Sequence, residues 1–161
     1  MESSDLSGPE GLPPHAIVIA VKISAKEEYA CLAVLELAMN YDPDLPIRVH
    51  DIAERQKIPV KFLFQIMQVL KRVDIVRSKR GTDGGYVLAR SPQDVSVGDV
   101  IRSISGPYVQ LSPNCDSDNT RQFKPIWDQV DHAIGSVLDD VTFARLASEA
   151  RIEGRQVMYH I

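Results

Sequence analysis

Cationic and amide side chains gather in one stretch of the chain, where they could bind a polyanion and read its surface. Between Arg48 and Arg90 stand ten basic and four acidic residues, so this stretch carries +6 and the remainder −10 of the net −4. Lys61, Gln65 and Gln68 follow at spacings of four and three, which places them on one face of a helix. Ammonium groups bind phosphates or guanine, and glutamine amides pair with adenine. These residues indicate nucleic-acid recognition, with an ordinary solvated helix face as the alternative.

Catalysis is not indicated by any group of residues. No nucleophile has a histidine and an acid at a recognisable spacing. The four histidines, at positions 15, 50, 132 and 160, form no metal-ligand pattern. We therefore expect neither an enzyme nor a metal site.

The composition is that of a soluble domain. The chain has 161 residues, of which 44% are hydrophobic and 25% charged. Its uninterrupted apolar stretches, such as Ala16 to Val21, are far shorter than the roughly 18 residues of a membrane-spanning helix. The flanks of this stretch lack the pattern of a secretory signal. We expect a cytoplasmic protein without membrane association.

Three helical patterns position the candidate residues. Ser24 and Glu27 form a capping box that opens a helix ending near Asn40. Two further helices are predicted over Val49 to Gln56 and Val60 to Arg72. The connection between them is only three residues long, and its proline suits the first position of the second helix. This short connection predicts a helix-turn-helix.

A basic hairpin follows. Ile75 to Ser78 and Tyr86 to Ala89 read as two short strands, and the glycine-rich run Gly81 to Gly85 supplies the turn between them. This run lacks the residues of a nucleotide-binding loop. Helix-turn-helix plus hairpin predicts a winged helix, whose wing offers Arg77, Ser78, Lys79 and Arg80.

The C-terminal part carries an apolar stripe. Ser96 to Ser105 predicts a short helix, and an irregular stretch from Gly106 to about Asn119 leads to a long helix. Its apolar residues recur every three or four positions: Phe123, Ile126, Trp127, Val130, Ile134, Val137 and Leu138. Such a stripe is too long for one small domain to cover comfortably, and a purely intramolecular core is the alternative.

Several of these motifs together resemble a known family. They are Ile23-Ser24-Ala25-Lys26 with Tyr29-Ala30, Asp51-Ile52-Ala53-Glu54-Arg55-Gln56, Phe62-Leu63, the wing from Arg80-Gly81 to Gly84-Gly85-Tyr86, and Val97-Gly98-Asp99-Val100-Ile101. The chain resembles the Rrf2 family of bacterial winged-helix transcription regulators, of the IscR and CymR kind, over about residues 21–147. The resemblance implies a mainly α (α+β) fold, a winged helix-turn-helix with a two-stranded wing and a long C-terminal dimerisation helix. It also implies a homodimeric transcription regulator.

The resemblance assigns further DNA contacts. Arg80 matches an arginine that reaches into a minor groove in relatives, and Lys26, Tyr29 and Lys71 match positions that grip the DNA backbone. Phe64 departs from the family because it replaces an acidic residue implicated in base choice. An exposed phenyl ring could touch thymine methyl groups, with local packing as the alternative. Asp74 stands where glycine normally ends the recognition helix.

The cysteines also depart from the family. Iron-sulfur members of the family place three cysteines at positions that match Val109, Cys115 and Arg121, and their further ligand matches Lys124. A cluster requires thiolates, so one cysteine does not hold it in the usual way, and we expect no cofactor. The alternatives are an iron-sulfur cluster shared between two subunits, a redox signal at a Cys115 sensor thiol, or a different effector.

The expected organisation has five parts. They are a flexible tail over residues 1–21, a DNA-binding winged helix-turn-helix over 22–106, an effector loop over 107–122, a dimerisation helix region over 123–149 and a C-terminal tail over 150–161. We expect a homodimeric regulator, most simply a repressor, that reads a palindromic operator on double-stranded DNA. An interaction module that acts through a protein partner is the alternative, and a small molecule or an effector protein is the expected signal.

Overall fold

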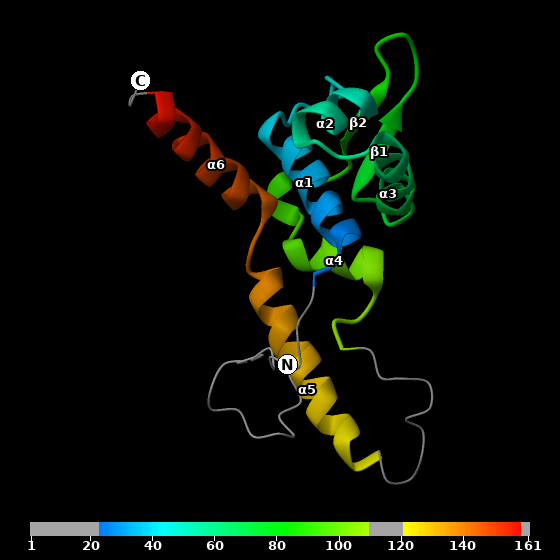
Figure 1. The fold of residues 1–161 in the computed structure, drawn as a ribbon, viewed down its shortest axis with the longest axis vertical. Coiled ribbons are helices and arrows are strands. Elements are labelled where there is room, and N and C mark those ends of the chain that lie inside the picture. The colour runs from blue at the N-terminus through cyan, green and yellow to red at the C-terminus, as the bar shows by residue number, and fades with distance from the viewer. Residues whose placement is uncertain (1–22, 110–120, 159–161) are drawn as a thin grey trace, which may run out of the picture.

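The computed structural model describes residues 23–109 and 121–158, and within them helices enclose a core beside a two-stranded sheet (Figure 1). The elements are α1 (Ala25–Met39), α2 (Val49–Gln56), α3 (Val60–Arg72), β1 (Val76–Lys79), β2 (Gly85–Leu88), η1 (Pro92–Asp94), α4 (Val97–Ser105), η2 (Arg121–Phe123), α5 (Lys124–Asp139) and α6 (Phe143–Met158). The mainly α winged-helix class is confirmed. The expected tail over 1–21, most of the effector loop and Cys115 lie outside the described residues.

Reciprocal caps begin two of the helices. The Ser24 N–H donates to Glu27 Oε2 at 2.6 Å, and the Glu27 N–H donates to Ser24 Oγ at 3.3 Å, which confirms the predicted box. Ser96 and Asp99 form the same arrangement at α4, with distances of 3.2 and 3.0 Å. Because Ser96 is the cap, α4 begins one residue later than predicted.

The turn between α2 and α3 contains a residue with left-handed backbone conformation. Lys57 ends α2 with a φ of 53°, which reverses the chain so that Ile58 enters the core. Pro59 has a ψ of 123° and is the N-cap, so its expected place as the first helical residue was wrong by one position. Asp74 follows α3 with a φ of 56°. This conformation explains why glycine is usual there, and Asp is among the residues that tolerate it.

The core sits between the first four helices and the sheet. Its completely buried side chains include Val34 of α1, Ile52 of α2, Leu63 and Leu70 of α3 and Val100 of α4. The helix α1 is enclosed along most of its length, whereas the buried residues of α3 recur at helical spacing and leave its opposite face in solvent. For α3 this leaves a polar face directed outward.

The wing is an antiparallel hairpin with a further backbone contact. Val76 pairs with Leu88 and Lys79 with Gly85, so each strand differs by one residue from its predicted bounds. Ile47, in the loop before α2, forms an isolated antiparallel bridge with Tyr86. The N–H of Ile47 donates to the Tyr86 carbonyl at 2.9 Å, and the N–H of Tyr86 donates back at 2.8 Å. The loop before α2 therefore holds the wing from one side.

Two helices replace the single C-terminal helix that the stripe suggested. α5 ends at Asp139 and α6 begins at Phe143, so the helical region predicted over 123–149 is interrupted. Phe143 and Ala147 are 0% and 3% exposed because α6 packs on α1. The helix continues to Met158, through much of the stretch expected as a tail from residue 150. Figure 1 shows that α5 projects away from the winged helix, whereas α6 begins beside α1.

Candidate nucleic-acid interface

The outward face of α3 carries the predicted base-reading side chains. Lys61, Gln65 and Gln68 are all exposed, whereas Leu63 and Ile66 are buried between them. The amide of Gln68 donates to the hydroxyl of Tyr86 at 3.3 Å, so this side chain also touches the wing. The structure therefore places the three residues on one solvent-facing surface next to the hairpin.

An aromatic pair lies on the neighbouring part of this surface. Phe64 is 44% exposed, and its ring packs edge-on against His50 of α2, with centroids 6.1 Å apart and an interplanar angle of 80°. Such edge-to-face contacts stabilise the orientation of both rings. Phe64 thus packs locally and still presents ring surface to solvent, so the two alternatives weighed from the sequence are compatible. His50 was not among the predicted interface residues.

The cationic side chains of the wing differ in their exposure to solvent. Arg77, Ser78 and Arg80 are exposed, and the ammonium group of Lys71 on α3 donates to Ser78 Oγ at 2.8 Å. Lys79 is half-buried and its ammonium group lies 3.2 Å from Asp44 Oδ1. Arg77 and Arg80 therefore present charge outward, while that of Lys79 is partly neutralised.

The loop end of the wing is attached to the residues before α2 by contacts that the sequence did not reveal. Arg48 donates to the carbonyl of Thr82 at 3.0 Å and lies 3.6 Å from a carboxylate oxygen of Asp83, so the residue before α2 reaches the hairpin loop. A Cβ on Gly85 would lie 2.3 Å from the carbonyl oxygen of Ile47. Only glycine permits this approach of two backbones, so Gly85 keeps the wing against the loop before α2.

Lys26 and Tyr29 belong to the first turns of α1. Lys26 is exposed, and Tyr29 is partly buried against the core. The helix that carries them packs against α3. Their role at the DNA backbone stays a prediction.

A buried carboxylate joins α1 to α2. Glu36 is 5% exposed and accepts hydrogen bonds from Arg55 at 2.8 Å, from Gln56 at 2.7 Å and from Asn40 at 3.0 Å. The hydrogen bond with Glu36 is the main cause that raises the pKa of Arg55. Buried carboxylates need such partners, and these partners attach α2 to α1.

The apolar stripe of α5 is largely uncovered in the single chain. Phe123, Ile126, Val130 and Val137 are 52%, 51%, 37% and 67% exposed. The remaining members, Trp127, Ile134 and Leu138, are half-buried. Within the described residues, the side chains of Phe123, Ile126, Val130 and Val137 therefore remain largely uncovered, in contrast to the core face of α6.

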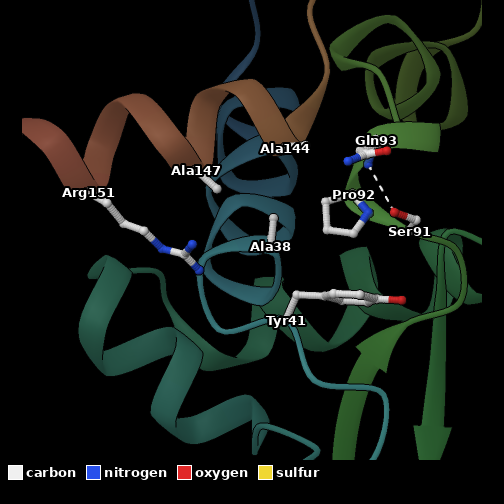
Figure 2. A pocket seen from close by; sticks show the side chains of 8 residues that line it. All are labelled: Ala38, Tyr41, Ser91, Pro92, Gln93, Ala144, Ala147 and Arg151. Carbon is white, nitrogen blue, oxygen red and sulfur yellow. Dashed lines mark hydrogen bonds between the residues drawn. The ribbon is translucent and has the colours of Figure 1, made fainter.

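A cavity of about 360 Å³ lies where α6 meets the winged helix (Figure 2). Ala38 and Tyr41 line it from α1 and the residues after it, Pro92 from η1, and Ala147 and Arg151 from α6. The guanidinium group of Arg151 donates to the carbonyl of Met39 and so attaches α6 to the end of α1.

Metal ligands do not gather in the part of the chain that the structure describes. No group of three or more His, Cys, Asp or Glu side chains is placed to hold a metal ion there. Cys31 is partly buried in α1, and desolvation, followed by the charges of Glu27 and Glu28, raises its pKa to about 11. The described donors therefore do not fit a cluster, and Cys115 falls in the stretch not described.

No helix in residues 23–109 and 121–158 is both long and apolar enough to cross a membrane.

Comparison with known proteins gives consistent matches. A family model named Rrf2, described as an iron-dependent transcriptional regulator, matches residues 23–149. The HTH-type transcriptional regulator CymR of Bacillus subtilis is 30% identical over 141 residues, which cover 88% of this chain and all of the relative.

Two solved structures are similar to the chain. IscR of T. potens has a TM-score of 0.64 and 36% identity, covering 80% of this chain and 88% of that one. The structure of CymR, titled the global cysteine regulator of B. subtilis, has a TM-score of 0.65 and 32% identity, covering 80% and 97%.

Proposed function

The chain belongs to the Rrf2 family of transcriptional regulators, and we propose that it acts as a homodimeric repressor that reads a palindromic operator through α3 and the wing. It is a DNA-binding regulator, not an enzyme. The observation that carries the proposal is the exposed face of Lys61, Gln65 and Gln68 beside the outward-facing arginines of the wing.

The helix α3 suits the major groove. A helix fits this groove, and lysine and glutamine side chains recognise guanine and adenine edges there. Gln65 is exposed near the middle of the helix and is our main base-reading residue, and Phe64 adds an apolar contact for thymine methyl groups. Gln68 contributes less because its amide already engages Tyr86.

The wing and α1 grip the DNA on either side of α3. Arg80 extends from the hairpin turn, and a guanidinium group suits the narrow, electronegative minor groove. Arg77, Ser78, Lys79, Lys71, Lys26 and Tyr29 supply the remaining contacts, which are directed to the DNA backbone. Such contacts set the register and orientation of the protein without specifying sequence.

Titration of labelled operator DNA at several salt concentrations tests this interface. The operator is first selected from random-sequence duplexes. Arg80→Ala should weaken binding and reduce the slope of log affinity against log salt by about 1, because each neutralised phosphate contributes about 0.9. Gln65→Ala should relax base preference at one position, with a loss of about 1–3 kcal/mol and little change in slope.

Arg145→Ala is the matched control, since it removes the same charge from the exposed side of α6. An unchanged affinity in Arg80→Ala removes the wing from the interface. Binding without salt dependence contradicts phosphate neutralisation and favours the alternative of an interaction module that docks a protein partner.

The stripe of α5 is the proposed dimer surface. Twofold pairing along it brings two copies of α3 to successive turns of the major groove, about 34 Å apart. Val130→Glu places a charge in the stripe and should convert the dimer to a monomer in analytical ultracentrifugation. His132→Glu is the control, because it lies two positions away on the opposite, exposed side of α5. A Val130→Glu chain that still sediments as a dimer contradicts the proposal.

We propose that DNA binding needs no cofactor and that the signal is a thiol reaction at Cys115, a small molecule or an effector protein. In support, Val109, Arg121 and Lys124 stand where the iron-sulfur members of the family place ligands, and a cluster requires thiolates. Anaerobic purification with measurement of iron, acid-labile sulfide and visible absorbance tests it, with Cys115→Ser in parallel. Stoichiometric iron that is lost in the variant favours the alternative, a cluster shared across the dimer.

A further inference from the structure

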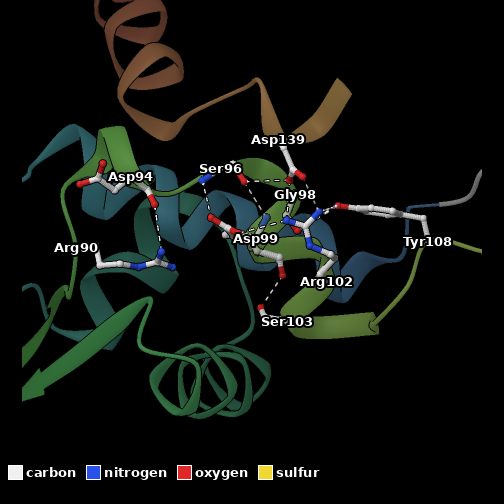
Figure 3. A network of polar contacts seen from close by, with 10 residues as sticks. Arg90, Asp94, Ser96, Gly98, Asp99, Arg102, Ser103, Tyr108 and Asp139 are labelled. Atoms are coloured by element: carbon white, nitrogen blue, oxygen red, sulfur yellow. Dashed lines mark hydrogen bonds and ion pairs between the residues drawn. The ribbon is translucent and has the colours of Figure 1, made fainter. Parts of the chain in front are cut away.

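One cluster of polar contacts joins the winged helix to α5 (Figure 3). The guanidinium group of Arg102, on α4, binds both carboxylate oxygens of Asp139 at the end of α5, at 2.7 and 3.1 Å. The same group reaches Asp99 at 3.3 Å and the hydroxyl of Tyr108 at 2.9 Å. The hydrogen bond with Asp139 is the main cause that raises the pKa of Arg102. A bidentate pair of this kind fixes direction as well as distance.

Around this cluster, the backbone of α4 also lies close to the end of α5. A Cβ on Gly98 would lie 1.9 Å from Asp139 Oδ1, so only glycine at this position admits the carboxylate. The hydroxyl of Tyr108 donates to the Gly98 carbonyl at 3.2 Å. Beside them, the N–H of Val97 donates to the carbonyl of Val141 at 2.9 Å. The end of α5 therefore rests directly on the start of α4.

The rest of α5 extends from this attachment. Its 16 residues correspond to a length of about 24 Å. Among the elements of the winged helix, α4 is the one with which α5 makes substantial contact. The helix α4 is in turn fixed to α1 and α3 through Val100 and Ile101, which are buried. The angle between α5 and the recognition helix thus depends on the contacts at Asp139.

We propose that Arg102, Asp139 and Gly98 form a joint that sets the distance between the two recognition helices of the dimer and hence the half-site spacing that the protein accepts. This inference rests on the proposed dimeric reading of a palindrome through the stripe of α5. A tilt of about 8° at the joint moves the far end of a helix of this length by about 3.4 Å, the rise of one base pair. Arg102 and Asp139 are positioning residues, because they act on DNA recognition through the placement of α3.

The joint contributes to orientation more than to folding. The side chains of Arg102 and Asp139 are 37% and 46% exposed, and ion pairs with this exposure add little to stability. Variants of the pair are therefore expected to fold. Circular dichroism and urea unfolding verify this before DNA binding is measured.

The experiment is selection of binding sites from random-sequence duplexes, followed by titration of operators in which one base pair is added or removed between the half-sites. The full-length wild-type chain should prefer one spacing at least tenfold over its neighbours. Asp139→Asn weakens the pair without changing its size, and Gly98→Ala displaces the carboxylate without changing charge. Both should reduce the preference to threefold or less, while affinity for a single half-site stays the same.

Each variant has a matched control. Glu149→Gln weakens an exposed ion pair of 2.9 Å with Arg145 on α6. Gly135→Ala adds a Cβ beside the joint, at 3.5 Å from Tyr108 and 3.8 Å from Arg102, which are ordinary contact distances that displace neither side chain. Both should keep the wild-type spacing preference. The inference is overturned if Asp139→Asn and Gly98→Ala keep it as well, or if the controls lose it equally. A wild-type chain that selects no paired half-sites refutes the proposed dimeric reading instead, which is a distinguishable result.

Discussion

Replacement of Gly85 by alanine tests how the wing is held. The added Cβ would lie 2.3 Å from the carbonyl oxygen and 2.6 Å from the carbonyl carbon of Ile47. Both atoms belong to the backbone, so the clash is relieved only when the loop before α2 separates from β2. That separation breaks the two hydrogen bonds of 2.8 and 2.9 Å between Ile47 and Tyr86.

The expected cost follows from those bonds. Each contributes about 1 kcal/mol, and the displaced loop also loses packing, so the free energy of unfolding should fall by about 2–3 kcal/mol. For a chain of this length the melting temperature then falls by roughly 5–10 °C. Operator affinity should fall too, because Arg80 lies on the hairpin that has lost its anchor.

Urea unfolding and amide hydrogen exchange measure the effect. In Gly85→Ala the amides of Ile47 and Tyr86 should lose their protection. Gly81→Ala is the control, since its Cβ meets nothing within 4 Å; its φ of 117° strains the turn, but the Ile47 and Tyr86 amides should remain protected. Wild-type stability with protected amides in Gly85→Ala would refute the anchoring role assigned to this contact.

Three further predictions concern stability and reactivity. Phe143→Ala should lower the free energy of unfolding by about 3–5 kcal/mol in a urea titration, because the ring is completely buried where α6 meets the core; a loss below 1 kcal/mol contradicts that packing. Burial alone raises the pKa of Glu27, but hydrogen bonds with Ser24 outweigh it and hold the pKa below 4.5. Glu27→Gln should therefore cost about 1 kcal/mol at pH 7, and this difference should shrink as the pH falls through the lowered pKa of Glu27, where the wild-type carboxylate also becomes neutral. A loss that stays the same throughout an acid titration contradicts the charge-based explanation. Cys31, with a pKa of about 11, should react with iodoacetamide at pH 8 about 100-fold more slowly in the folded than in the unfolded chain, as followed by site-resolved mass spectrometry. Equal rates would show that the thiol is not desolvated.

Features that depend on neighbouring residues were predictable from the sequence. The capping box of Ser24 and Glu27 and the bounds of α2 and α3 were confirmed, because caps and helical periodicity act within a few residues. The exposed face of Lys61, Gln65 and Gln68 followed for the same reason, since burial of one side of α3 leaves the other in solvent. The two-stranded wing followed from a glycine-rich turn between two short strands.

Contacts between segments that are distant in the sequence could be identified only from the tertiary structure. Ile47 binds Tyr86, and Arg102 binds Asp139 across 37 positions of the chain. Phe143 carries the same apolar character as the stripe before it, yet it is completely buried while Val137 is 67% exposed. Periodicity tells which side of an element is apolar, but not which other element will cover it. That depends on how separately formed helices and strands pack, so the sequence determined the reading surface, and the tertiary structure alone determined how the wing and α5 are attached to it.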